Sequence, residues 1–325
     1  MSVTIHDVAR RANVSISTVS RAFTSPDLVR HQTRSRVLAA ASELGYHAVG
    51  APQSTARTGH IGIVVSDLGN PFFTGVLDGV QARARQDDVA VLFASSDQDP
   101  ATEQNLVRRM ARQVDGVVLG SPSMTDDQLR ALATQTTLVL LNREVPGIPS
   151  IVMNAADGMR QAIEHLAALG HRRCAYLGGP RMSWANRARR QGLAEAAERH
   201  GTEVVEFGPF PPVFEGGLQG ADLALAADVT AIVAYNDLVA FGALARLNAR
   251  GVPVPDEISL VGFDDLVFAA ISAPPLTTIA MPTEAAGRAA VTIMLDLLDG
   301  AADEQTTQVL DTYLIVRATT APPAS

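Results

Sequence analysis

Polar side chains follow several apolar segments of this 325-residue chain at the point where each segment ends. The four clearest cases are Ser66, Asn142, Asn236 and Asp264. Because the carboxyl ends of parallel strands meet at one edge of a sheet, we expect these side chains to face a common cleft. Their hydroxyl, amide and carboxylate groups supply the paired donors and acceptors that vicinal hydroxyls require. The sequence therefore predicts a binding site for a sugar or a related polyol.

Aromatic and basic residues add to this candidate site. Phe72, Phe73 and Trp184 could pack on the apolar face of a sugar ring. Arg187 and Arg189 stand near the start of a predicted helix and could hydrogen-bond to sugar hydroxyls. A phosphate ligand is disfavoured, because no glycine-rich loop that could cradle a phosphate precedes a helix.

Several of these residues also have an alternative, purely structural role. Asn236 and Asp237 stand at the predicted start of a helix and could serve only as its cap. Adjacent residues of an extended chain point to opposite sides, so at most one of Asp264 and Asp265 faces a ligand. We expect Asp265 to brace a loop. The two phenylalanines fit a core or a lobe-closing position equally well.

The first 45 residues show a different pattern, three short helical segments with small polar residues at their starts. Two helices joined by a short turn form a helix-turn-helix pattern, in which the start of the second helix meets base edges in the major groove. Ile16 could contact a thymine methyl group, Ser17 could donate or accept, and Arg21 could pair with guanine. The hydroxyls that could bind phosphates are those of Thr4, Ser15, Thr18, Ser20 and Thr33. The alternative is a helical cap on the body, with these hydroxyls as helix caps.

Capping signals locate the ends of these helices. The Thr4 hydroxyl and the Asp7 carboxylate fit a capping box. Asn13 fits a turn that requires positive φ, and Ser15 fits a cap of the second helix. Helical spacing predicts that the inward-facing side chains are Val8, Ala12, Val19, Ala22, Val37, Leu38, Ala41 and Leu44.

The charge of the chain is divided between two segments. The chain has 26 basic residues, all of them arginine, and 34 acidic residues, for a net charge of −8. Residues 1–60 carry +4, whereas residues 61–325 carry −12. A basic segment on an acidic body moves the interpretation of the three helices towards DNA binding. We expect phosphates to repel the acidic body and to hold it away from the duplex.

Residues 61–325 alternate apolar runs with amphipathic helices, which is the pattern of a doubly wound α/β fold. Runs that are apolar on both faces are typical of parallel strands covered by helices. The predicted strands are 61–65, 90–93, 116–119, 137–141, 174–177, 204–207, 231–234 and 258–261, and the clearest helices are 103–112, 159–169 and 185–200. Because this segment is too long for one sheet, we expect two lobes.

Composition excludes several other classes of protein. Hydrophobic residues make up 47% of the chain, which excludes global disorder. No apolar run approaches the roughly 18 residues of a membrane helix, and charged residues stand where a signal peptide would be apolar. The single cysteine, Cys174, cannot form an intrachain disulfide or a cysteine zinc cluster. We expect a cytoplasmic protein that needs no metal or cofactor and binds no membrane.

The segment from Val3 to Arg21 resembles the N-terminus of LacI/GalR-family transcriptional regulators. Matching motifs continue in order along nearly the whole chain: Thr33-Arg34, Leu44-Gly45-Tyr46, Asn70-Pro71-Phe72-Phe73, Asp115-Gly116, His165-Leu166, Leu169-Gly170-His171, Asn236-Asp237, Gly262-Phe263-Asp264-Asp265 and Pro275-Leu276-Thr277-Thr278. The resemblance implies an N-terminal all-α helix-turn-helix head, residues 1–46, and a hinge linker, residues 47–60. It implies a two-lobed periplasmic-binding-protein-like body of two doubly wound parallel sheets, residues 61–325. The chain would cross between the lobes near residues 155–160, 280–284 and 308–314.

The resemblance also implies partners and roles. It implies a homodimer, or alternatively a tetramer, that binds a near-palindromic DNA operator. It favours Asp264, Asn236 and Arg187 as contacts of a small-molecule effector, with Asn142 next, and the matching motif near residue 70 adds Asn70. A sugar or polyol is the favoured effector, with a nucleobase as the second choice.

The linker departs from the family pattern. In such regulators a hinge helix inserts a leucine into the minor groove and kinks the DNA. No leucine occurs between residues 50 and 60, and Pro52 restricts where a helix could start. We therefore expect a weak or absent minor-groove wedge, with major-groove contacts supplying more of the specificity.

Three functions compete on the sequence alone. The favoured one is a ligand-responsive regulator, most simply a repressor, whose operator affinity depends on an effector bound between two lobes. A solute-binding protein of a sugar uptake system shares the two lobes, but it predicts a signal peptide and no DNA head. A glycosidase using Asp67 and Asp264 is the third, and no nucleophile elbow, metal cluster or phosphate loop supports it.

Overall fold

The structure is a computed structural model that describes residues 4–24, 29–44, 46, 57–301 and 306–324. It divides into two compact units, Met1–Arg57, here called the head, and Thr58–Ser325, here called the body. Each unit has a hydrophobic core of its own.

The described residues of the head form helices α1 (Ile5–Ala12), α2 (Ile16–Thr24) and α3 (His31–Leu44). Its core consists of small side chains: Val8, Ala9, Ala12, Val19, Ala22, Val37, Ala40 and Ala41. The inward positions predicted from helical spacing are confirmed with one exception. Leu38 is 38% exposed, and Ala40 lies in the core instead. Leu38 is displaced about 100° around α3 from the buried Val37, so the buried stripe is narrower than predicted.

The predicted capping residues are confirmed at the start of α1 and at the turn between α1 and α2. The Asp7 carboxylate accepts hydrogen bonds from the backbone N–H of Thr4 (3.0 Å) and from its hydroxyl (2.7 Å). Asn13 ends α1 with a φ of 53°, and the Ser15 hydroxyl accepts the backbone N–H of Thr18 at 3.1 Å. The turn at Asn13 and the Ser15 cap define where α1 ends and α2 begins.

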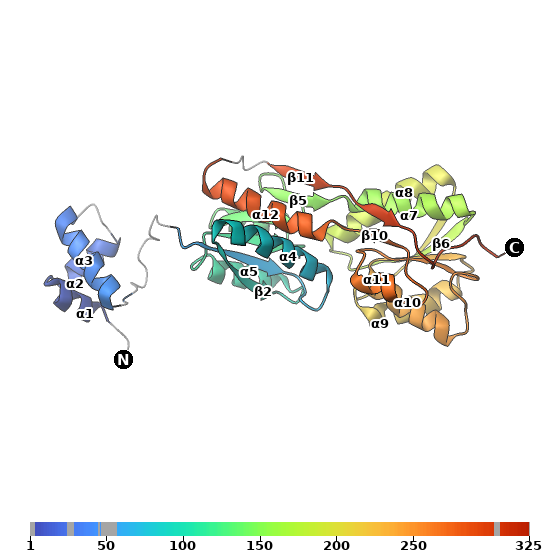
Figure 1. The fold of residues 1–325 in the computed structure, drawn as a ribbon, viewed down its shortest axis with the longest axis horizontal. Coiled ribbons are helices and arrows are strands. Elements are labelled where there is room, and N and C mark those ends of the chain that lie inside the picture. The colour runs from blue at the N-terminus through green and yellow to red at the C-terminus, as the bar shows by residue number, and fades with distance from the viewer. Residues whose placement is uncertain (1–3, 25–28, 45, 47–56, 302–305, 325) are drawn as a thin grey trace. The chain divides into compact units, whose positions relative to one another are not determined.

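The N-terminal lobe of the body is a parallel sheet with the strand order β11-β5-β4-β3-β1-β2 (Figure 1). Its strands are β1 (His60–Val65), β2 (Ala90–Ser95), β3 (Gly116–Gly120), β4 (Thr137–Leu141), β5 (Ser150–Met153) and β11 (Thr307–Leu310). One face carries α4 (Phe72–Ala84), which runs into a 3-10 turn (Arg85–Asp87), and α12 (Thr283–Leu298); the other carries α5 (Pro100–Met110) and α6 (Asp126–Ala133). Because helices cover both faces, β3 is buried along its whole length.

The C-terminal lobe repeats this plan with a parallel sheet of order β7-β6-β8-β9. Its strands are β6 (Arg173–Leu177), β7 (Glu203–Phe207), β8 (Ala231–Ala234) and β9 (Ser259–Val261). Helices α7 (Ala155–Leu169) and α8 (Trp184–His200) pack together, as do α9 (Phe214–Leu225) and α10 (Asp237–Ala249), and α11 (Val267–Ile271) follows β9. Every strand predicted from the sequence is present within two residues of its predicted bounds. The two doubly wound lobes confirm the predicted fold class.

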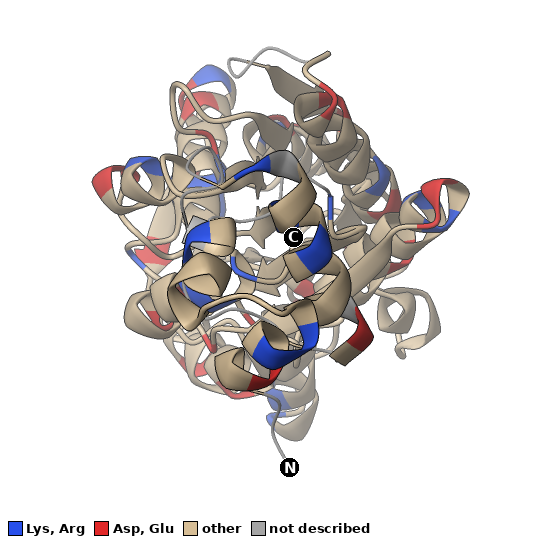
Figure 2. Cartoon of the chain, turned by 90° about the vertical axis from the view of Figure 1, so that its left-hand side faces the viewer, with Lys and Arg blue, Asp and Glu red and all other residues tan. Residues whose placement is uncertain are grey.

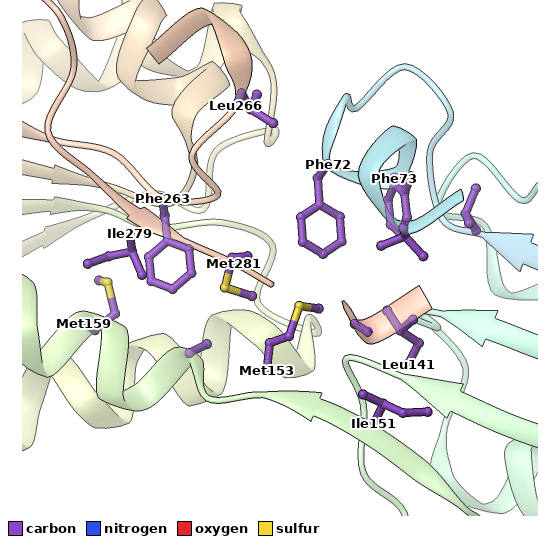
Figure 3. Close-up of a cluster of buried hydrophobic side chains, with 14 of the residues drawn as sticks. Phe72, Phe73, Leu141, Ile151, Met153, Met159, Phe263, Leu266, Ile279 and Met281 are labelled. Atoms are coloured by element: carbon purple, nitrogen blue, oxygen red, sulfur yellow. The ribbon is translucent and has the colours of Figure 1, made fainter. Parts of the chain in front are cut away.

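The chain passes between the lobes along three described segments (Figure 1). They are β5 to α7, β10 (Thr278–Ala280) to α12, and β11 to β12 (Tyr313–Ile315). β10 and β12 pair antiparallel beside them. One buried cluster continues through this hinge, in which Phe72 and Met153 of the first lobe approach Met281 and Phe263 of the second (Figure 3). Methionine side chains adapt to irregular gaps, so this joint suits a change in the angle between the lobes.

The compact unit of the body begins at Thr58, three residues before the predicted boundary at Ile61. Thr58, Gly59 and His60 fall within the predicted linker, yet the Asp115 carboxylate accepts the backbone N–H of Thr58 (2.6 Å) and of Gly59 (2.9 Å). His60 already belongs to β1. These contacts tie residues 58–60 to the body. The expectation of a weak or absent minor-groove wedge concerns the linker, of which residues 47–56 lie outside the described residues.

Candidate functional site

A cavity of about 450 Å³ lies between the two lobes. Nine of the ten predicted effector contacts line it: Ser66, Asn70, Phe72, Phe73, Asn142, Trp184, Arg189, Asn236 and Asp264. They come from the carboxyl ends of strands and the starts of helices in both lobes. The carboxyl ends of the strands of both sheets therefore bring together side chains that are far apart in the sequence, as the alternation of strands and helices predicted.

The backbone around this cavity is unusual. Gln98, Ser121, Asn142 and Asp264 line it with φ values of 61°, 50°, 57° and 117°. Side chains other than glycine rarely adopt positive φ, and each such residue costs about 1–3 kcal/mol. Strain of this kind at the ends of β2, β3, β4 and β9 is typical of a binding site, where the backbone is held to direct side chains into the cleft.

Arg189 and Asp264 form a buried ion pair on the C-terminal side of the cavity. The Nη2 atom of Arg189 donates to Asp264 Oδ1 at 3.1 Å, and its Nη1 atom donates to the carbonyl oxygen of Tyr235 at 2.6 Å. The guanidinium lies between the rings of Tyr235 and Phe263, 4.4 and 3.9 Å from their centroids. Both charged side chains are only 4% exposed. Arg189 Nε has no hydrogen-bond partner among the described residues, so the pair keeps a donor to spare.

Arg187 is not part of this cavity, which contradicts the prediction for that residue. Its side chain is exposed, and it does not line the cleft. Residues two apart on a helix point about 200° away from each other. Since α8 directs Arg189 into the cleft, it directs Arg187 to solvent.

Asn142 supplies the best-placed polar group of the N-terminal lobe. Its amide Nδ2 donates to the Ser121 hydroxyl at 3.2 Å. Its Oδ1 atom is buried and has no hydrogen-bond partner among the described residues. An unmade hydrogen bond at a buried acceptor costs about 1–3 kcal/mol, so a ligand that donates to Asn142 would be favoured.

Asn236 and Asp237 have the structural roles that the sequence analysis left open. Asn236 Oδ1 accepts the backbone N–H of Val239 at 3.0 Å and so caps α10, while its Nδ2 donates to the carbonyl oxygen of Pro212. Asp237 is fully buried and accepts hydrogen bonds from the Thr278 hydroxyl (2.6 Å) and the Leu266 N–H (2.8 Å). Burial and the nearby Asp264 carboxylate raise the pKa of Asp237 to about 8.

Asp264 itself remains an acid of moderate strength. Burial raises its pKa to about 6, although the Arg189 guanidinium acts in the opposite direction. It is therefore mostly ionised near neutral pH. Its neighbour Asp265 accepts a hydrogen bond from Arg317 at 2.7 Å and does not line the cavity. This agrees with the expectation that Asp265 braces a loop.

The aromatic residues form a wall of the cavity. Phe72 and Phe73 are buried and lie edge to face, with ring centroids 5.0 Å apart. Both belong to the core cluster that crosses the hinge and both also line the cavity (Figure 3). Trp184, at the start of α8, is half-buried. Core packing and ligand contact are thus combined in the two phenylalanines.

Tyr235 is a prominent residue of this wall that was not among the residues predicted from the sequence. Its ring lies against Gly179, where an added Cβ atom would stand 2.6 Å from the ring. The missing side chain of Gly179 thus lets Tyr235 approach and cover Arg189. Tyr235 directly follows β8, so its place at a strand end was the signal that could have identified it.

The second candidate surface is the start of α2 in the head. Ile16 is 42% exposed, and Ser17 and Arg21 are exposed beside it. The Ser15 hydroxyl lies 2.9 Å from that of Ser17 and 2.8 Å from that of Thr18. An exposed isoleucine beside hydroxyls and an arginine offers both apolar and polar contacts to base edges.

The remaining predicted phosphate contacts of the head are spread over its helices. Thr4 is exposed at the start of α1, whereas Ser20 and Thr33 are half-buried. Arginines lie on α1, α2 and α3 (blue in Figure 2). Arg10 pairs with Asp7 and Arg11 with Glu43, whereas Arg21 is exposed near the predicted base contacts.

No group of three or more His, Cys, Asp or Glu side chains in the described residues could hold a metal ion. None of the helices described is long and apolar enough to cross a membrane.

A helix-turn-helix head joined to a two-lobed body with a ligand cleft defines a class, the transcription regulators controlled by small molecules. Residues 4–48 match the family model for bacterial regulatory proteins of the lacI family. Residues 163–320 match the model for the periplasmic binding protein-like domain. The chain belongs to the lacI family and is a DNA-binding transcriptional regulator.

Individual relatives match over nearly the whole chain. The transcriptional repressor CytR of Escherichia coli K12 is 31% identical over 98% of this chain and 96% of its own length. The structure of the regulator CelR in complex with cellobiose is 32% identical over 98% of this chain and 100% of its own, with a TM-score of 0.74. A lac repressor dimer bound to operator and the anti-inducer ONPF is 28% identical over 99% of this chain and 100% of its own, with a TM-score of 0.74.

Proposed function

We propose that this protein represses transcription as a homodimer and that a sugar or polyol bound between its lobes controls its affinity for operator DNA. The observation that carries the proposal is the buried Arg189–Asp264 pair facing the cavity at 3.1 Å. A charged pair beside aromatic rings suits a ligand with neighbouring hydroxyls, because each hydroxyl both donates and accepts.

The opposite wall supports the same ligand class. The unpartnered Oδ1 atom of Asn142 belongs to the N-terminal lobe, whereas Arg189 and Asp264 belong to the C-terminal lobe. A hydroxylated ligand that bonds to both sides would hold the lobes together. Binding energy used in this way shifts the equilibrium between open and closed forms and changes the conformation of the body.

The relatives support the partners in this proposal. CelR was solved with cellobiose, a sugar, and the lac repressor was solved as a dimer on operator DNA. CytR carries the name of a repressor. Two copies of the head would read two half-sites related by the dimer axis. A regulator that binds chromosomal DNA works in the cytoplasm of a bacterium.

Catalysis is not part of this proposal. Asp264 is held by Arg189, and Asp67 accepts the backbone N–H of Gly69 at 2.7 Å. These bonds suit fixed acceptors of a binding site. We therefore expect no release of nitrophenol from aryl glycosides incubated with the protein.

The proposal is tested by thermal unfolding of the full chain with a panel of monosaccharides, disaccharides, polyols and nucleobases. A ligand at 100 times its Kd stabilises the folded protein by about 2.7 kcal/mol. This corresponds to a rise in Tm of roughly 5 °C or more for a domain of this size. The rise should be absent in Asp264→Asn, which keeps the shape and loses the charge. The proposal fails if no member raises the Tm of the wild type, or if the rise persists in the variant.

A further inference from the structure

Seven arginines of the body form no ion pair within the described residues, and three of these seven lie close together in the sequence. Twelve of the nineteen arginines between residues 61 and 325 form an ion pair within the described part of the chain. Arg108, Arg109 and Arg112 are not among them, although they lie within five residues of one another. All three are exposed. They are called the α5 arginine cluster below.

The cluster lies where the chain enters the body. Arg108 and Arg109 belong to the last turn of α5, and Arg112 to the turn that follows. Three residues later, Asp115 accepts hydrogen bonds from Thr58 and Gly59. α5 also packs against β1. The cluster therefore lies on the segment that leads to Asp115, the residue that holds the start of the body.

The number of residues between the head and the body sets an upper limit on the distance between them. The linker is measured from Tyr46, which follows α3, to Thr58, where the body begins. Twelve peptide steps extend over at most about 43 Å, at about 3.6 Å each. One turn of duplex spans about 34 Å. DNA that flanks an operator bound by the head is thus within reach of the cluster.

Stabilisation of α5 does not explain why three unpaired arginines lie together at its end. Arg112 lies beyond the end of α5, where repulsion from Arg108 and Arg109 brings the helix no stability. The helix dipole favours cations at a C-terminus, but a paired arginine serves that purpose too, as Arg83 with Asp87 does at the end of α4. Three unpaired charges on a body of net −12 concentrate positive potential at one place.

We propose that the α5 arginine cluster binds backbone phosphates of DNA flanking the operator. The contact is independent of sequence, because it neutralises phosphates and releases counterions. It revises the expectation that the acidic body is simply held away from the duplex. Repulsion acts over the rest of the body, and attraction acts at the end that carries the linker.

The test uses the duplex that the full-length wild-type protein selects from a random pool, in two lengths. The short duplex ends at the selected site, and the long duplex adds about 15 base pairs on each side. Operator binding is measured by fluorescence anisotropy for the wild type and for Arg108→Gln/Arg109→Gln/Arg112→Gln. The matched control is Arg181→Gln/Arg199→Gln/Arg250→Gln, which removes the same charge from exposed positions of the C-terminal lobe. Circular dichroism and Tm verify that each variant folds, and Arg112→Gln alone serves if the triple variant does not.

We expect the operator affinity of the cluster variant to differ from that of the wild type only on the long duplex. Each lost phosphate contact lowers the slope of log K against log salt by about 0.9. A homodimer carries two clusters and would lose six contacts, so between about 50 and 200 mM salt the wild type loses on the order of 1,000-fold more affinity than the cluster variant. The control should match the wild type, and all three proteins should bind the short duplex alike. Equal affinity and salt slope of the cluster variant and the wild type on the long duplex would overturn the proposal. So would a control variant that weakens binding as much.

Binding to the short duplex distinguishes a failure of the cluster proposal from a failure of the proposed regulatory function. Loss of all DNA binding by the wild type would count against the helix-turn-helix head itself. Normal binding to the short duplex with no effect of flanking DNA would count only against the cluster.

Discussion

Replacing Arg189 with methionine tests how the cleft is held. Methionine keeps much of the side-chain volume between Tyr235 and Phe263 but removes the charge that faces Asp264. Breaking a buried ion pair by removing one partner costs about 3–5 kcal/mol of the free energy of unfolding. We expect a loss in this range at pH 7.5.

The pKa of Asp264 predicts how this loss depends on pH. In the wild type that pKa is about 6, with burial raising it and Arg189 lowering it. Without Arg189 the pKa of Asp264 rises further, so a smaller fraction of the carboxyl is ionised at pH 7.5. Each pH unit above the pKa is worth about 1.36 kcal/mol to the ionised form. The wild type therefore gains about 2 kcal/mol from ionisation at pH 7.5, of which the variant loses part, so the loss of stability caused by Arg189→Met should be larger at pH 7.5 than at pH 5.5.

The assay is urea unfolding of the full chain at the two pH values, followed by tryptophan fluorescence. Trp184 is the single tryptophan of the chain and lies in the cleft, so its signal reports on the body alone. The control is Arg190→Met on the next position of α8, whose ion pair with Glu206 is exposed and is worth less than about 1 kcal/mol. A loss for Arg189→Met that is below about 1 kcal/mol, or equal at both pH values, would refute this account of the pair.

Three further predictions concern the linker, the buried acid and the α8 arginine outside the cleft. Thr55→Leu should tighten operator binding and increase DNA bending in a gel-shift assay, relative to Thr55→Ala; no change in either would remove the argument for a missing minor-groove wedge. Asp237 has a pKa of about 8 in the folded protein, whereas an unfolded aspartate has a pKa near 3.9. Unfolding therefore releases a proton between these values, and the free energy of unfolding falls as the pH rises. Asp237→Asn should flatten this fall between pH 6 and pH 8.5 in urea unfolding; parallel profiles of variant and wild type would contradict the assignment. Arg187→Ala should leave the calorimetric affinity for the identified effector within about twofold, whereas a tenfold loss, about 1.4 kcal/mol, would restore Arg187 to the site.

Much of the fold could be predicted because its strands are apolar on both faces. Runs such as that of β3 have one stable environment, a parallel sheet covered by helices, so periodicity alone locates them. The strands that were missed, β5, β10, β11 and β12, are three or four residues long. β10, β11 and β12 are exposed in part and pair with segments distant in sequence. Local patterns do not specify such pairings, because tertiary contacts decide them.

The candidate site could be predicted as a set but not in every member. Strand ends predict which segments meet, whereas the direction of a side chain on a helix depends on how the helix packs. Arg187 and Arg189 are equivalent in residue type and position, and only the packing of α8 directs Arg189 to Asp264. Leu38 and Ala40 on α3 show the same limit, since the small alanine faces the core.

The central claim is that the cleft and the DNA-binding head are coupled. The most direct test measures two ratios: the operator Kd with and without saturating effector, and the effector Kd with and without saturating operator duplex. Because coupling between two binding sites is reciprocal, both ratios must be equal, and typical couplings correspond to about 5–150-fold. We predict equal ratios in this range for the wild type. In Asp264→Asn, no effector concentration should change operator binding. An effector that binds in the cleft while both ratios remain at one would contradict the account.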